Sequence, residues 1–196
     1  MELYLIRHGE TVWNAKGLLQ GKHDIELNEK GIIAAKKYGK KIENVYFDKI
    51  YSSPLQRAYK TAEIIKGNRN IQIITDERLR ELSFGDCEGT DFRVWRENKC
   101  PYHWFFDDPA QYIAPHNGEN LVDLCERTKD FIKSVIEPQL NNATRIMIVA
   151  HGALNASIMT YLEKRDLSHF WGDGLQGNCE ATVYTFNGKW ALRADN

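Results

Sequence analysis

Leu5-Ile6-Arg7-His8-Gly9-Glu10-Thr11 is the stretch of this 196-residue chain that says most about its fold. Residues 2–6 are predicted to form a short strand, so the cation of Arg7 and the imidazole of His8 follow at its end. That order puts a fixed positive charge beside a candidate nucleophile at a sheet edge. A lone histidine after a strand is more often a packed or surface residue, so the interpretation depends on the rest of the chain.

The same pattern recurs at the end of a second predicted strand. Residues 145–149 form a β-branched run bounded by polar residues, which is typical of a buried strand. The run continues into Ala150-His151-Gly152, and a helical pattern follows from 153 to about 162. In open α/β sheets, ligands bind outside the carboxyl ends of the strands, where the strand order switches. Two His-Gly turns at two strand ends therefore predict a binding site at that edge.

A third predicted strand, residues 49–52, leads into a helix that would bind an anion. Ser53 is a good N-cap and Pro54 suits the first helical position, so a helix is expected from 55 to about 66. Arg57 then lies in the first turn. A helix N-terminus attracts anions, and an arginine there adds a planar fork of donors that suits phosphate. The alternative is a solvent-facing arginine on an amphipathic helix.

The remaining pattern predicts an α/β fold, a three-layer sandwich with a mostly parallel central sheet flanked by helices. Asn28 is expected to cap a helix at about 29–42, and Pro138 to end or kink a long helix from 119 to about 141. Asn187-Gly188 predicts a hairpin between strands at 181–186 and 189–193. Further elements are a strand at 71–74 and a short helix near 91–98. The prediction is a single domain, 1–196, with a small lid-like segment at about 88–118.

The net charge, the apolar runs and the cysteine spacing of the sequence exclude several classes of binding partner. The net charge of −1 gives no support for a nucleic-acid or membrane-surface partner. The sequence has no signal peptide and no apolar run near membrane-spanning length. The cysteines are scattered without metal-ligand spacing, at Cys87, Cys100, Cys125 and Cys179. Reduced thiols in a cytoplasmic protein are expected, with a disulfide as the alternative, and neither a metal nor a cofactor is expected.

Four motifs together resemble the histidine phosphatase superfamily, which includes phosphoglycerate mutases, fructose-bisphosphatase domains and many bacterial phosphatases. They are the stretch at 5–11 and the segments 52–62, 79–89 and 149–152. They occur in the family's order and extend from residue 5 to residue 152. Each is weak alone, but the ordered set is specific. The resemblance implies a phosphoglycerate mutase-like fold.

The resemblance also implies a catalytic set. His8 would be the nucleophile and form a phosphohistidine, while Arg7 and Arg57 would hold the phosphoryl oxygens. His151 would donate a hydrogen bond to the transferring group, and Asn14, six residues after His8, would be a neutral donor. Spacing alone leaves open that His151 attacks and His8 only binds.

Glu81 is the candidate general acid, and the base for water in the second step. Glu88 is the rival. The acid must carry a proton near neutral pH, which burial or the incoming phosphate would favour, so an acidic-to-neutral optimum is expected. Gly21 and His23 lie in the loop after the nucleophile. The predicted substrate-binding residues are thus Arg7, Asn14, Gly21, His23, Arg57, Glu81, His151 and Gly152.

The predicted reaction is metal-independent hydrolysis of a small-molecule phosphomonoester. Family mutases are longer, whereas the segment between Glu88 and Glu119 is compact and rich in aromatic residues. That segment is either ordinary core under a loop or an apolar wall over the leaving group. A cofactor-dependent phosphoglycerate mutase is the alternative, and a non-catalytic phosphate-binding module is less favoured. The hairpin leaves an edge strand that is compatible with a homodimer.

Overall fold

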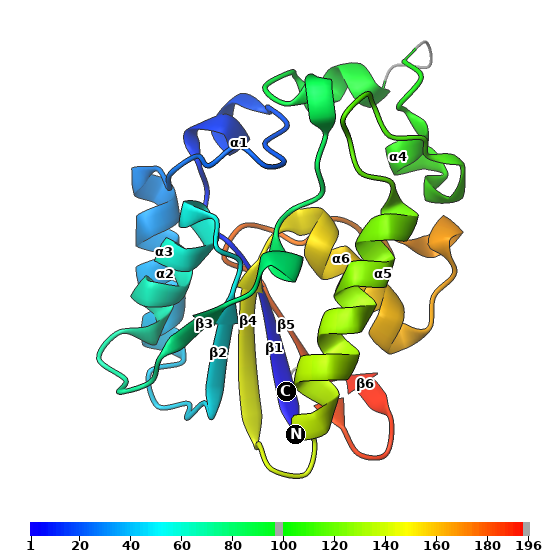
Figure 1. Cartoon of the computed structure of the whole chain (residues 1–196). Helices are drawn as coiled ribbons and strands as arrows, with labels where there is room; N and C mark the ends of the chain where they lie inside the picture. Colours follow the sequence, from blue (N-terminus) through cyan, green and yellow to red (C-terminus); the bar gives the residue numbers. More distant parts are fainter. Residues whose placement is uncertain (97–99, 194–196) are drawn as a thin grey trace.

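The computed structural model describes residues 1–96 and 100–193, and its centre is a six-stranded sheet (Figure 1). The strand order is β3-β2-β4-β1-β5-β6. The first four strands are parallel to one another, β5 is antiparallel to its neighbour β1, and β6 is antiparallel to β5. The strands are β1 (Glu2–Arg7), β2 (Lys49–Ser52), β3 (Ile73–Thr75), β4 (Arg145–Ala150), β5 (Ala181–Phe186) and β6 (Trp190–Leu192). The predicted α/β class with a mostly parallel sheet is confirmed.

The two strands that end in histidine are direct neighbours. β1 pairs with β4 in parallel, with Ile6 opposite Val149 and Arg7 opposite Ala150. The backbone N–H of His8 continues the ladder by donating to the carbonyl of Ala150 at 2.9 Å. Both histidines therefore leave the sheet at the same edge.

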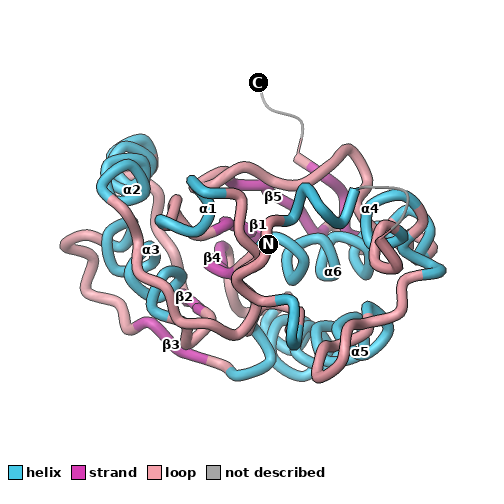
Figure 2. The backbone as a smooth tube through the Cα atoms, turned by 90° about the horizontal axis from the view of Figure 1, so that it is seen from above, coloured by secondary structure: helices cyan, strands magenta, loops and turns pink. Residues whose placement is uncertain are grey.

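Helices cover both faces of this sheet (Figure 2). α2 (Glu29–Lys41) and α3 (Gln56–Lys66) lie on one side, and α5 (Leu121–Phe131) and α6 (Gly152–Glu163) lie on the other. Alternate residues of β1 serve the two layers, because successive side chains of a strand point to opposite faces. Tyr4 and Ile6 belong to the core under α2 and α3, and Leu3 and Leu5 to the core under α5 and α6.

Several predicted boundaries differ from the observed ones. The helix after β2 begins at Gln56 with Leu55 at its N-cap position, so the predicted cap at Ser53 is wrong.

The long helix is α-helical only over Leu121–Phe131, followed by a π-helical turn (Ile132–Ile136) and a 3₁₀ turn (Glu137–Gln139). Pro138 lies in that last turn, where its missing N–H ends the regular hydrogen bonding. β3 begins two residues later than predicted, and Asn28 caps α2 as expected.

The segment from 76 to 118 lies above the carboxyl edge of the sheet, near α1 (Val12–Lys16) (Figure 1). It is built from short helices that periodicity did not reveal, including α4 (Trp104–Asp107) and 3₁₀ turns at Glu77–Leu79, Gly85–Cys87 and Pro109–Gln111. The helix predicted near 91–98 is a 3₁₀ helix over Phe92–Arg96, and residues 97–98 lie outside the described part of the chain. The lid-like role of this segment stays a prediction.

β5 and β6 form the predicted hairpin, and β6 is an edge strand; the homodimer inferred from it stays a prediction. All four cysteines are free. Within residues 1–96 and 100–193, no helix combines the length and the apolar character needed to cross a membrane.

Candidate active site

His8 is fixed by its backbone at the end of β1. Its carbonyl accepts a hydrogen bond from the side chain of Asn178 at 2.9 Å, and its own side chain is buried. The next residue must be glycine, because a β-carbon on Gly9 would lie 2.8 Å from the carbonyl oxygen of Gly31 in α2. The close approach of α2 thus holds the turn that carries His8.

One tautomer of the His8 ring is selected. Nδ1 lies 2.7 Å from the carbonyl oxygen of Gly9. A carbonyl can only accept, so we assign the ring proton to Nδ1, which leaves a lone pair on Nε2. Burial, followed by the positive charges of Arg57 and Arg7, holds the pKa of His8 well below its usual value. A neutral imidazole with a free Nε2 is the form that a nucleophile requires.

His151 lies beside His8 with the opposite nitrogen engaged. The two ring centroids are 5.2 Å apart, and Nε2 of His151 is 2.7 Å from Oγ of Ser53. That hydroxyl also accepts the N–H of Leu55 at 3.3 Å. We assign its own proton to the bond with Nε2, which leaves the ring proton of His151 on Nδ1. Burial lowers the pKa of His151 well below its usual value, with Arg57 adding to the effect. Ser53 thus orients an imidazole instead of capping a helix.

Arg57 lies in the first turn of α3, as predicted, and is fully buried. Nη1 donates to the carbonyl of His23 at 2.6 Å and Nη2 donates to the carbonyl of Gly21 at 2.8 Å. Burial lowers its pKa to about 10 against the opposing pull of Glu81, so the guanidinium remains charged at neutral pH. The loop around residue 21 therefore fixes the direction of this cation.

Arg7 is fixed by a contact with the loop that precedes β5. Nη1 donates to the carbonyl of Gln176 at 2.5 Å. The Gln176 side chain donates to the carbonyl of Leu5 at 3.0 Å and accepts from Asn155 at 2.8 Å. Gln176 was not foreseen, because it lies in a loop without any motif and meets Arg7 only in three dimensions.

Three buried donors at this edge point to an anion site. Among the described buried side-chain atoms, only five lack a hydrogen-bond partner, and three of these are Nε of Arg7, Nε of Arg57 and Nδ1 of His151. Buried polar groups are normally paired, so such a gathering needs an explanation. Arg7 and Arg57 line the cavity described below and suit a phosphoryl group, and His151 lies behind its wall.

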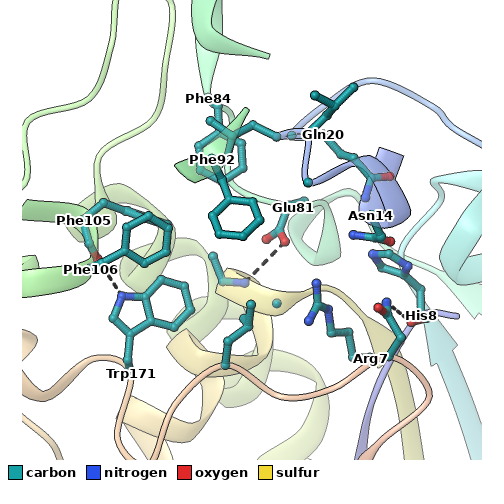
Figure 3. A pocket seen from close by; sticks show the side chains of 18 of the residues that line it. Arg7, His8, Asn14, Gln20, Glu81, Phe84, Phe92, Phe105, Phe106 and Trp171 are labelled. Carbon is teal, nitrogen blue, oxygen red and sulfur yellow. Dashed lines mark hydrogen bonds between the residues drawn. The ribbon is translucent and has the colours of Figure 1, made fainter. Parts of the chain in front are cut away.

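Glu81 lies at the N-terminus of α6. Its carboxylate accepts N–H groups of Leu154 at 3.1 Å, Leu82 at 3.0 Å and Ala153 at 3.3 Å. Figure 3 shows it between Asn14 and His8 on one side and a group of aromatic rings on the other. An acid or base there can reach a group that bridges the two sides.

Glu88, the rival acid, is used differently. Its carboxylate accepts the N–H groups of Lys22 at 3.0 Å and Phe84 at 3.1 Å and lies 2.5 Å from Nδ1 of His23. His23 was predicted to touch substrate, but its side chain is not on the cavity described below; it pairs with Glu88 and contributes only its backbone carbonyl to Arg57. This pairing draws the imidazole away from the phosphate end.

A cavity of about 500 Å³ joins these groups. Predicted site residues on its wall are Arg7, His8, Asn14, Gly21, Arg57, Glu81 and Gly152. The side-chain Oδ1 of Asn14 accepts hydrogen bonds from the backbone N–H and the hydroxyl of Thr11. The side-chain NH₂ of Asn14 is therefore left for the cavity. His151 is wholly buried behind the wall. Across the described residues, no group of three or more His, Cys, Asp or Glu side chains could hold a metal ion.

Fold and site together define an α/β protein with a buried histidine and two arginines on the wall of one cavity. The model of the histidine phosphatase superfamily (branch 1) matches residues 3–195. The chain therefore belongs to the histidine phosphatase superfamily.

Individual relatives include both phosphatases and mutases. The chain is 31% identical to phosphoserine phosphatase 1 of Hydrogenobacter thermophilus, over 94% of this chain and 85% of that protein. It is 35% identical to the phosphoglycerate mutase of Schizosaccharomyces pombe, over 87% of this chain and 81% of the mutase. The solved structure of Bacillus stearothermophilus YhfR matches with a TM-score of 0.88 and 34% identity, covering 97% of this chain and 94% of YhfR.

Proposed function

We propose that this protein is a phosphomonoester hydrolase that works through a phosphohistidine on His8 and needs no metal ion. The observation that carries the proposal is the pairing of a neutral His8, whose Nε2 is free, with three unpartnered buried donors at the same edge among the described residues. A neutral nucleophile avoids repulsion by the phosphate dianion. The fixed cations supply the charge neutralisation that metal ions give in other phosphatases.

In the first step, Nε2 of His8 attacks phosphorus and the bond between phosphorus and the alcohol oxygen breaks. The electron pair of that bond goes to the leaving oxygen, which takes a proton from Glu81. Arg7 and Arg57 hold the phosphoryl oxygens as charge moves onto them. The ring of His151, which lies behind the cavity wall, turns when the phosphoryl group binds, and its Nδ1–H donates to one of these oxygens. Preorganised donors of this kind typically contribute about 10²–10³ each to the rate.

In the second step, water attacks the phosphohistidine. Glu81, now ionised, takes a proton from the water, and the bond between phosphorus and Nε2 breaks with its electron pair returning to His8. Inorganic phosphate leaves and Glu81 is again protonated. One carboxyl group thus acts as acid and then as base.

The contacts of the rival residues support this assignment of roles. His151 has Nε2 committed to Ser53 and is fully buried, whereas Nε2 of His8 is free and His8 lines the cavity. Glu88 pairs with His23 and is not on the cavity wall, whereas Glu81 lines the cavity.

A mutase is the second candidate, because similar chains include phosphoglycerate mutases. A mutase would transfer the phosphoryl group from His8 to a second hydroxyl in place of water. Isomerisation of 3-phosphoglycerate that requires 2,3-bisphosphoglycerate as a primer would identify it.

The test is release of inorganic phosphate from a panel of phosphomonoesters in the presence of EDTA. His8→Ala should abolish release, and His169→Ala, which changes an exposed histidine, should leave it unchanged. Rapid quenching of the native protein should trap an acid-labile phosphohistidine. If no ester is hydrolysed and no mutase activity appears, the protein is a phosphate-binding module and the proposal is wrong. The cytoplasmic location stays a prediction.

A further inference from the structure

The cavity has two chemically different ends (Figure 3). Arg7, His8 and Asn14 form the phosphate end. At the other end, on the far side of Glu81, aromatic rings gather from the 76–118 segment and from residue 171, and the cavity is lined there by Phe84, Phe92, Phe105, Phe106 and Trp171. Because Glu81 would protonate the leaving oxygen, the aromatic end lies where the alcohol part of the substrate would extend.

The rings present apolar faces in a fixed arrangement. The indole N–H of Trp171 donates to the carbonyl of Phe105 at 2.6 Å, so the only polar atom of that ring is already paired. Phe106 and Trp171 are stacked, with 21° between their planes and 6.2 Å between their centroids. Phe92 lies next to Phe106, with centroids 6.4 Å apart.

The ring group is supported from behind. Phe105 is buried and makes edge contacts with Phe84 and with Trp95, at centroid distances of 5.6 Å in each case. Trp95 is itself almost fully buried. The wall therefore does not need a ligand to order it, which lowers the entropic cost of binding an apolar body there.

The charges at this end do not suit an acidic alcohol. The cations on the cavity wall are Arg7 and Arg57 at the phosphate end and Arg96, which is exposed and lies 4.6 Å over the ring of Phe106. Asp107, also exposed, lines the cavity as well and carries the opposite charge. A carboxylate on the alcohol would lose water against the aromatic rings, and among the residues that the structure describes at this end there is no buried cation to replace that water.

We propose that the cavity selects phosphomonoesters whose alcohol carries an uncharged, flat apolar body, such as an aromatic ring, which packs against Phe92, Phe106 and Trp171. This inference rests on the proposed hydrolase function, because it names the leaving group that the same site accepts. Phosphorylated three-carbon acids are then poor substrates.

The decisive comparison uses 3-phenylpropyl phosphate and propyl phosphate. Both release an alkoxide of similar basicity, so the two reactions differ in the apolar body and not in leaving-group chemistry. The expected kcat/KM is about 10- to 100-fold higher for the phenylpropyl ester, mainly through a lower KM. Phosphoserine and 3-phosphoglycerate should also fall below the phenylpropyl ester.

Two variants locate the effect. Phe106→Ala should reduce the preference for the phenylpropyl ester by roughly five-fold or more, because it removes one ring of the stacked pair. Val94→Ala, at an exposed position of the same segment that does not line the cavity, should leave the preference unchanged. An equal preference in Phe106→Ala and in the native protein would overturn the assignment of this wall.

Failure of the inference and failure of the function can be told apart. Hydrolysis of every ester with no preference for the phenylpropyl group would overturn the inference and leave the hydrolase function intact. Hydrolysis of none would overturn the function. The apolar end would then still be judged by calorimetry on the native protein with 3-phenylpropylphosphonate and propylphosphonate, which cannot be hydrolysed: tighter binding of the former supports the apolar site, and equal affinity refutes it.

Discussion

Glu88 fills the space that a side chain on Gly21 would need: a β-carbon on Gly21 would lie 1.9 Å from Oε1 of Glu88. Gly21 also has a φ of +52°, a region that favours glycine. The carboxylate of Glu88 accepts a hydrogen bond from the N–H of Lys22, and the carbonyl of Gly21 accepts one from Arg57. Glu88 is therefore connected to the phosphate end of the cavity through the backbone of the loop at residues 21 and 22.

Replacing Glu88 with glutamine should weaken phosphate binding by misplacing Arg57. The amide oxygen can still accept the N–H groups of Lys22 and Phe84, but the NH₂ group that replaces Oε2 carries no charge and cannot accept a hydrogen bond from His23. We therefore expect the loop to shift. Misplacements of about 1 Å can lower rates by about 10²-fold, and we expect a loss in kcat/KM of at least roughly 10-fold with a raised inhibition constant for inorganic phosphate. Glu126→Gln, at an exposed position, is the control. Unchanged phosphate inhibition in Glu88→Gln would contradict the connection.

Replacing Glu81 with glutamine should separate the two chemical steps. Alkyl phosphates need a proton on the leaving oxygen, so their kcat should fall by about 10²–10⁴. 4-Nitrophenyl phosphate needs much less help, so His8 should still be phosphorylated, and hydrolysis of the phosphohistidine should become slow. Rapid-mixing measurements should then record a burst of nitrophenol close to one per active site. Equal losses for both esters without a burst would remove Glu81 from the role of acid.

The two buried histidines should make the folded state less stable in acid. Burial lowers the pKa of His8 and of His151 well below 6.5 in the folded state. Below pH 6.5 the unfolded chain takes up protons on these rings and the folded chain does not, so the free energy of unfolding falls as pH falls. The slope approaches about 1.4 kcal/mol per pH unit for each imidazole.

This pH dependence can be measured by urea unfolding at several pH values between 7 and 5. The His8→Asn, His151→Asn double variant should have a flatter profile than the native protein over that range. Parallel profiles would mean that other groups cause the acid sensitivity.

Gly31→Ala should destabilise the fold although it lies in a helix. In an exposed helix this change stabilises by up to about 1 kcal/mol. Here the new β-carbon would lie 2.2 Å from the carbonyl oxygen of Glu10, so α2 must move from the turn after His8. We expect a loss of about 1–3 kcal/mol in the free energy of unfolding, measured by urea titration. Lys30→Ala, exposed in the same turn, is the control, and an equal or higher stability of Gly31→Ala would refute the packing argument.

The sequence predicts those parts of the fold and site that depend on local pattern. β1 and β4 are apolar runs that stop at histidine, and Arg57 follows β2 within one helical turn. Parallel strands end at the same edge of a sheet, so local signals were enough to bring His8 and His151 together. The alternating burial of β1 residues follows from the same pattern.

Contacts between distant segments could not be predicted in this way. Ser53 has the local features of a helix cap, but the imidazole of His151, 98 residues away, takes its hydroxyl. Glu88 and His23 carry no signal for their pairing, and Gln176 carries none for its contact with Arg7. Each depends on loop paths that periodicity does not specify. The short helices of the 76–118 segment were missed because helices of three to five residues have too few turns to show a period.

The position of β1 in the sheet links catalysis to the order of folding. β1 pairs with β4, whose first residue, Arg145, lies 143 positions after Glu2, and with β5, which is farther still along the chain. Pairings at such sequence separation form slowly, because loop closure must precede the contacts that stabilise it. The ladder that these pairings build also fixes His8 beside His151. A growing or truncated chain that lacks its last fifty residues thus has no assembled phosphate site, and hydrolytic activity appears only when both ends of the molecule have met.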